Sequence, residues 1–86
     1  MISLPREYVV AKFYEYGRSP IYNKFNNVYQ CSCPVCRESL KKRRCYYLPD
    51  NDNVYCHNCG WSSKPWKWIR EVSGLSNQQI IDEVKE

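Results

Sequence analysis

The chain is short, basic and rich in cysteine: its 86 residues carry a net charge of +4 and include six cysteines and one histidine. A chain of this length buries only a small core, and such domains often need a metal or disulfides for stability. No stretch approaches the roughly 20 apolar residues of a membrane span, and the first residues lack the pattern of a secretory signal. We therefore expect an intracellular protein with no membrane partner, whose reduced cysteines bind metal.

The first third of the chain predicts a helix followed by a loop and a strand. Residues 4–16 suit a helix, because Pro5 fits a first helical position and Gly17 a stop. Residues 18–27 are predicted as a loop, and residues 28–32 as a short strand leading to the first cysteine pair. The helix has apolar side chains at spacings of three and four, which should face the core: Val9, Phe13 and Tyr16.

The remainder predicts a hairpin and two short helices. Residues 43–49 and 54–56 favour strands joined by the polar turn "DNDN". Residues 62–74 predict a short helix, and residues 76–86 a terminal helix. The termini of these helices carry the expected signals: Ser63 as an N-cap, Pro65 near the start, Gly74 as a stop, and a capping box of Ser76 and Gln79. Three apolar side chains of the last helix should face inward: Ile80, Ile81 and Val84.

The strongest motif is C-x2-C-x19-C-x2-C. Two residues between cysteines allow a tight turn that directs both sulfurs to one point, and two such turns close a tetrahedral zinc site. Gly60 follows the second pair, where a positive φ is often needed. A single redox pair is a weak alternative, because the chain has no room for a βαβ fold. We predict one structural Zn²⁺ held by Cys33, Cys36, Cys56 and Cys59.

Three other potential ligands surround this motif. Cys31 stands two residues before the first ligand, so strand alternation puts both on the same side. Cys45 has the simpler interpretation of a small buried apolar residue. His57 could replace a cysteine at the metal, but its place inside the second turn favours exposure or contact with nucleic acid. A four-cysteine zinc site has no open position for water, and no catalytic set is visible in the sequence.

Basic and aromatic residues gather around the cysteines. Residues 33–70 carry eight basic and three acidic side chains, a net +5, whereas residues 71–86 carry one basic and four acidic, a net −3. Such a distribution points to an anionic partner, nucleic acid first. In the alternative interpretation, the basic run is only a solvent-exposed hairpin tip, and about half of the tyrosines and tryptophans pack in the core. The candidate nucleic-acid contacts are Arg37, Lys41, Lys42, Arg43, Arg44, Tyr46, His57, Asn58, Trp61, Lys64 and Lys67.

These elements together predict one small α+β domain, a zinc ribbon flanked by N- and C-terminal helices. An N-terminal helix and loop would occupy residues 1–28, the ribbon residues 29–63, and the C-terminal helices residues 64–86. In a zinc ribbon an antiparallel β-hairpin or sheet surrounds the four-cysteine site, and the 19-residue gap is long enough for that hairpin.

The motifs as a set resemble the N-terminal zinc-binding domain of bacteriophage DNA primases, those of T-even-type phages above all. The resemblance covers about residues 29–72 and is carried by "CPVC", a basic stretch, the "YY" strand, a polar turn and "VYCHNCGW" before an aromatic-rich helix. The chain is more distantly similar to the zinc domains of bacterial and T-odd-type primases. Bacterial primases often have a histidine among the ligands, whereas this chain has cysteine at all four positions.

The resemblance implies a function in primer initiation. In that family the ribbon binds single-stranded DNA template, helps to select where a primer begins, and helps to hold the nascent RNA primer. Carried over by position, the four cysteines would bind zinc, and His57, Asn58 and residues 41–44 would reach a base or the primer. RNA synthesis belongs to a separate TOPRIM-type polymerase domain, whose acidic motifs this chain lacks. That domain and a replicative helicase are the expected protein partners.

Two other functions remain open at this point. A transcription-associated ribbon would bind duplex DNA or an RNA polymerase. An acidic hairpin tip would favour it, but the run beside Asp50 and Asp52 is basic. A protein-interaction ribbon would use its tryptophans as an apolar patch for a partner.

Overall fold

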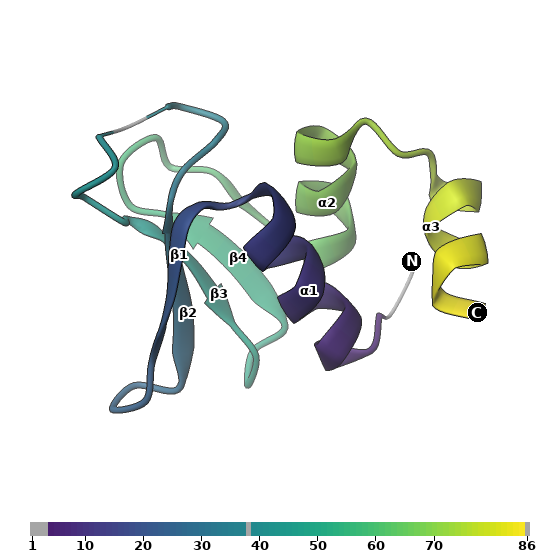
Figure 1. The fold of residues 1–86 in the computed structure, drawn as a ribbon, viewed down its shortest axis with the longest axis horizontal. Coiled ribbons are helices and arrows are strands. Elements are labelled where there is room, and N and C mark those ends of the chain that lie inside the picture. Colours follow the sequence, from purple (N-terminus) through teal and green to yellow (C-terminus); the bar gives the residue numbers. More distant parts are fainter. Residues whose placement is uncertain (1–3, 38, 86) are drawn as a thin grey trace.

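The computed structural model describes residues 4–37 and 39–85, within which the chain forms five strands and three helices (Figure 1). Residues 1–3, 38 and 86 lie outside the described residues, and with them the ends of the predicted terminal segments. The elements in chain order are α1 (Arg6–Tyr16), β1 (Arg18–Asn23), β2 (Val28–Ser32), β3 (Cys45–Leu48), β4 (Asn53–Cys56), β5 (Ser62–Ser63), α2 (Pro65–Ser73) and α3 (Asn77–Lys85).

The five strands form one antiparallel sheet in the order β1-β2-β3-β4-β5, so each strand pairs with the next along the chain. Figure 1 shows the helices gathered to one side of the strands, with α3 farthest from the sheet. The prediction of a small α+β fold with an antiparallel sheet and helices at both ends is confirmed.

The prediction of a loop over residues 18–27 was wrong, because residues 18–23 form the edge strand β1. Ile21, Tyr22 and Asn23 pair with β2, and the register shifts between Arg18 and Ile21. That irregularity contains Pro20, which lacks a backbone donor and is tolerated in a strand only at an edge or a bulge. The strand therefore depends on its partner β2 rather than on an alternating pattern of its own.

A single core lies between the helices and one face of the sheet. Its ring contacts join α1, α2 and β3: the Phe13 ring lies 5.2 Å from Trp68 and 6.2 Å from Tyr47, centroid to centroid. Strand alternation then separates the two sheet faces, since Cys45 and Tyr47 are buried while Tyr46 is half-exposed. The core residues other than cysteine are Val9, Phe13, Val28, Tyr47, Val54, Trp68, Ile69 and Ile80.

The ends of the two C-terminal helices follow local signals in the sequence. The predicted capping box is confirmed: Ser76 N donates to Gln79 Oε1 at 2.8 Å, and Gln79 N donates to Ser76 Oγ at 3.2 Å. Gly74 ends α2 with a left-handed φ of 77°, as expected of a stop. Ser63 is not the N-cap of α2. That position belongs to Lys64, because residues 62–63 are drawn into the sheet as β5.

The N-terminal helix ends where space allows only glycine. Gly17 adopts an extended conformation and donates its N–H to Phe13 O. A Cβ at this position would lie 2.4 Å from that oxygen and 2.9 Å from Cys31 Sγ. The close approach brings α1 against β2, so Gly17 is required for packing rather than for a positive φ.

The last helix is fixed to the first by a charged cluster. Glu83 Oε1 accepts hydrogen bonds from the Tyr8 hydroxyl at 2.7 Å and from Lys12 Nζ at 3.0 Å. The hydrogen bonds from Tyr8 and Lys12 lower the pKa of Glu83. Burial and the same hydrogen bond raise the pKa of Tyr8 to about 12. Of the apolar residues predicted to face inward on α3, Ile80 is fully buried, while Ile81 and Val84 are half-buried.

A Glu83→Gln variant is expected to lose stability near neutral pH and to match the wild type in acid. Because the folded pKa of Glu83 is depressed, its contribution is complete above the ordinary value of 4.5 and is lost as the pH falls through the folded pKa. Thermal unfolding of both proteins in excess zinc measures the gap from about pH 7 down to the lowest pH at which metal content shows that both proteins still hold zinc. Ser76→Ala is the control, since its cost should not change with pH. A constant gap for Glu83→Gln would contradict the assignment.

Candidate metal centre

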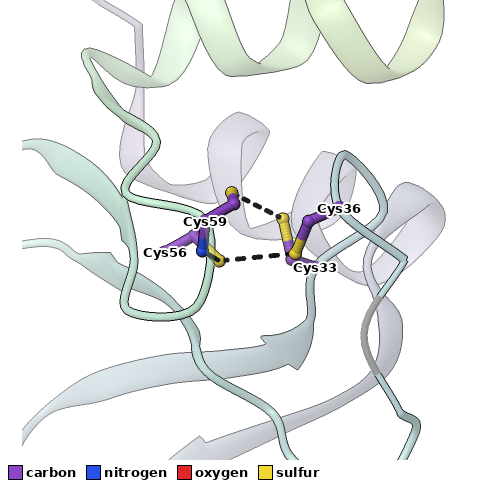
Figure 2. Close-up of side chains that lie close together, drawn as sticks. All are labelled: Cys33, Cys36, Cys56 and Cys59. Carbon is purple, nitrogen blue, oxygen red and sulfur yellow. Dashed lines mark hydrogen bonds between the residues drawn. The ribbon is translucent and has the colours of Figure 1, made fainter.

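Four cysteines from two turns converge at one end of the sheet. Cys33 and Cys36 follow β2, while Cys56 ends β4 and Cys59 lies in the turn beyond it. Their four Sγ atoms all lie within 4.8 Å of one another. Figure 2 shows the sulfurs facing each other as two pairs, Cys33 with Cys59 at 4.0 Å and Cys36 with Cys56 at 3.9 Å. Sulfurs bound tetrahedrally at about 2.3 Å from a zinc ion are about 3.8 Å apart.

The two turns have the same backbone geometry. In the first, Arg37 N donates to Cys33 O at 2.9 Å; in the second, Gly60 N donates to Cys56 O at 2.8 Å. Arg37 and Gly60 both have a left-handed φ, 53° and 80°. Each C-x2-C segment thus closes into a turn that aims both sulfurs inward, as the spacing predicts. The equivalent position is a glycine in one turn and an arginine in the other.

The surroundings of the four cysteines stabilise the ionised thiolate at some positions and destabilise it at others. Asn58 Nδ2 donates to Cys36 Sγ at 3.3 Å, and Cys59 N donates to Cys56 Sγ at 3.5 Å. Although burial opposes it, hydrogen bonds from the Asn58 amide and from the neighbouring cysteine thiols lower the pKa of Cys36. Burial raises the pKa of Cys33, and raises that of Cys56 to about 11. A bound divalent ion would offset the cost of ionising all four thiols.

The predicted convergence of these four cysteines is confirmed, and together they could hold one metal ion. Within residues 4–37 and 39–85, no second group of three or more such side chains lies close enough to do so. The cysteines form no disulfide. Soft thiolates in a tetrahedral set select zinc or iron rather than magnesium or calcium.

The two remaining cysteines and the histidine lie outside the cluster. Cys31 and Cys45 face each other across β2 and β3, and both are fully buried. Hydrogen bonding with Cys31 and burial raise the pKa of Cys45, which keeps this thiol neutral. The interpretation of Cys45 as a small buried residue is confirmed. His57 is exposed and is not part of the four-sulfur group, so the structure favours its non-metal alternative.

Substitutions at Arg37 and Gly60, the two residues with a left-handed φ, are expected to have opposite effects on stability. Gly60→Ala should destabilise the metal-loaded protein by about 1 kcal/mol, because a side chain at this φ is strained. Space does not contribute, since nothing lies within 4 Å of an added Cβ. Arg37→Gly should remove the corresponding strain and leave stability equal or higher. Urea unfolding in excess zinc measures both variants, and equal destabilisation of the two would contradict the equivalence of the turns.

The basic candidates divide into exposed side chains and side chains held by the protein. Arg43 donates through Nε to Ser19 O at 2.8 Å and through a terminal nitrogen to Ser19 Oγ at 3.0 Å. Arg44 donates to Asn58 Oδ1 at 3.0 Å, which links it to the cysteine cluster. Arg43 therefore holds β1 in place, a role that the sequence does not reveal. The exposed candidates are Arg37, Lys41, Lys42, Lys64 and Lys67.

The aromatic candidates Tyr46 and His57 meet on the outer face of the sheet, the face opposite the core. The His57 ring lies 4.8 Å from the Tyr46 ring and 4.6 Å from the Tyr55 ring, edge-on to both. Tyr55 was missing from the candidates, although pairing residues 43–49 with 54–56 places it directly opposite Tyr46. We call these three residues the aromatic platform.

The platform belongs to a row that crosses the whole sheet. The strand registers align one residue from each strand on the outer face: Ile21, Gln30, Tyr46, Tyr55 and Ser62. At about 4.8 Å between neighbouring strands, the row is about 19 Å long. The tryptophans lie elsewhere: Trp68 is fully buried, while Trp61 and Trp66 are half-buried. None of the three is among the exposed large hydrophobic side chains of the described residues.

Comparisons of the chain with models of known protein families, with curated proteins and with solved structures found no match. None of the helices in the described part of the chain has the length and apolar character needed to cross a bilayer.

Proposed function

We propose that this chain is a zinc-binding module that binds single-stranded nucleic acid, and that it serves as the template-recognition domain of a phage-type DNA primase. The observation that carries the proposal is the aromatic platform of Tyr46, Tyr55 and His57, held on an open sheet face beside the four-cysteine cluster. The metal is Zn²⁺, because its preferred tetrahedral thiolate geometry agrees with the sulfur separations.

The platform suits unpaired bases better than a duplex. Aromatic side chains bind single strands by stacking on successive bases, whose faces are hidden in a double helix. Tyr46 and Tyr55 are half-exposed on a sheet face that the described helices do not cover. His57, which is exposed, extends the platform toward the cysteine turns. Tyrosine and histidine rings so arranged can stack on two or more neighbouring bases.

The charges near the platform suit the phosphates of the same strand. Arg37, Lys41 and Lys42 are exposed in the loop between β2 and β3, and Lys64 is exposed at the start of α2. The first three lie at the end of the sheet that carries the cysteines, and Lys64 directly follows β5, the edge strand where the row ends. A strand lying along the row would place its phosphates within reach of both, and its affinity would fall as salt rises.

The role in priming is supported by the resemblance of residues 29–72 to the zinc domain of phage primases. In this proposal the chain selects the template and steadies the RNA primer, and a separate polymerase domain makes the RNA. Because four thiolates leave no open position on the metal, the zinc stabilises the binding face and does no chemistry. The partners are the single-stranded template, the primer, the polymerase domain and a replicative helicase inside the cell.

The first test is a titration of zinc-loaded protein into labelled single-stranded and double-stranded DNA of mixed sequence, followed by anisotropy at two salt concentrations. We expect tighter binding to the single strand and weaker binding at higher salt. Preference for duplex would contradict the proposal and favour a transcription-associated ribbon. Binding to neither would also contradict it, provided that the protein is folded and metal-loaded.

A further inference from the structure

A polar cleft lies at the edge of the sheet, between β5 and the C-terminal half of α2. Its volume is about 680 Å³, within the range of small-molecule sites. It is bounded at its far end by the segment that leads into α3. The lining side chains that matter here are an indole, two cations, one carboxylate and two hydroxyls: Trp61, Lys67, Arg70, Glu71, Ser63 and Ser76.

Hydrogen bonds hold Trp61 in place, so a ligand in the cleft would contact the surface of its ring. Its Nε1 donates to Ser63 Oγ at 2.9 Å, so the polar edge of the indole already has its partner. Its backbone carbonyl accepts from Cys56 N at 2.8 Å, which ties it to a metal-ligating turn. The remaining apolar surface of the half-buried ring lines the cleft. An aromatic wall of this kind suits a flat ring rather than an aliphatic chain.

Lys67 and Arg70 supply positive charge one helical turn apart on α2. Both are exposed, and the ion pairs of the described residues include neither. The Arg70 guanidinium lies 5.6 Å from the centre of the Trp66 ring, a contact that positions it without neutralising it. Glu71 opposes these charges, so the three side chains give the cleft a net +1. An anionic group in the cleft would pair with the two cations.

We propose that this cleft binds a nucleoside phosphate, with the base against Trp61 and the phosphate at Lys67 and Arg70. The combination of an aromatic wall, two cations outside the ion pairs of the described residues and the lining hydroxyls of Ser62 and Ser76 matches the flat base, the anion and the sugar of such a ligand. Ser62, the last residue of the outer row, also lines the cleft. The site thus adjoins the proposed strand-binding face but does not depend on it.

The test is a calorimetric titration of the zinc-loaded protein with ATP, with adenosine and inorganic tripolyphosphate as partial ligands. We expect ATP to bind with one site per chain and both partial ligands to bind at least about tenfold more weakly, since each lacks one set of contacts. Lys67→Gln combined with Arg70→Gln should weaken ATP binding about tenfold or more. Lys41→Gln combined with Lys42→Gln removes the same charge outside the cleft and should leave it nearly unchanged.

Trp61→Phe should retain most ATP binding, and Trp61→Leu should lose it while still binding zinc. Equal weakening of ATP binding by the two double variants would mean that the cations attract ATP only at long range, and would overturn the proposal. Tripolyphosphate binding as tightly as ATP, or no ATP binding by folded protein, would overturn it as well. Single-strand affinity, measured on the same Lys67 and Arg70 variant and on a Tyr46→Ala variant, separates the two sites. We expect the Lys67 and Arg70 variant to lose ATP binding and keep its single-strand affinity, and Tyr46→Ala to do the reverse. An unchanged ATP affinity in the first variant overturns the cleft proposal alone, and an unchanged single-strand affinity in the second overturns the strand-binding proposal alone.

Discussion

Removal of the metal is expected to abolish the cooperative folding of this protein. Structural zinc contributes roughly 10–16 kcal/mol in small metal-binding domains, whereas the whole stability of a domain is about 5–15 kcal/mol. Here Cys33 and Cys56 are themselves fully buried next to the core, so an empty cluster would leave a weakly packed end of the sheet. Chelation should collapse the near-ultraviolet circular dichroism and the dispersion of amide resonances, and added zinc should restore both.

Two single variants separate the metal from simple burial. Cys56→Ala should remove metal binding and unfold the chain at ordinary temperature. Cys45→Ala deletes an equally buried sulfur that lies outside the cluster. It should retain one metal ion per chain and lose only about 1–2 kcal/mol of unfolding free energy. A folded, stable apo protein, or equal losses in the two variants, would contradict a structural metal.

Truncation of the aromatic platform is expected to weaken single-strand binding by about tenfold for each ring removed. Stacking of a base on an aromatic side chain contributes roughly 1–3 kcal/mol, and about 1.4 kcal/mol corresponds to a factor of ten. Tyr46→Ala and Tyr55→Ala each remove one ring from the outer face and leave the cysteine turns intact. Anisotropy titrations with labelled single-stranded DNA measure the loss.

The matched control for these variants is Tyr14→Ala. Tyr14 is 45% exposed, but it belongs to α1 on the opposite side of the sheet. Its removal should not change the affinity for DNA, while metal content and thermal unfolding show that all three variants remain folded. Equal affinities of Tyr46→Ala, Tyr55→Ala and the wild type would mean that the strand does not lie on this face.

The basic residues of the loop between β2 and β3 differ in how well their substitution tests phosphate contacts. Because Arg43 is bonded to Ser19, its loss would loosen β1 as well as remove a positive charge. Lys41 and Lys42 are exposed, and they report on phosphate contacts more directly. A drop in the salt dependence of binding on neutralising these lysines, with stability unchanged, would support phosphate contacts from this loop.

The sequence by itself determined the features that depend on neighbouring residues. Two-residue spacing fixes the geometry of each cysteine turn, so the cluster of four followed directly from the motif. The capping box at Ser76 and the stop at Gly74 are likewise local, because each depends on hydrogen bonds within one helical turn. The hairpin from residue 45 to residue 56 was evident from two strand-forming runs around a polar turn.

Only the tertiary structure decided which distant residues lie together. Strand β1 carries Pro20 and no alternating pattern, so its strand conformation comes from pairing with β2 and from the bonds of Arg43. Tyr55 joined the platform because the register of the sheet places it opposite Tyr46. The cleft beside Trp61 lies between β5, a two-residue strand that pairs with β4, and α2, which follows β5 along the chain. Local sequence fixes the conformation of turns and caps, but pairing between strands is a property of partners far apart in the chain.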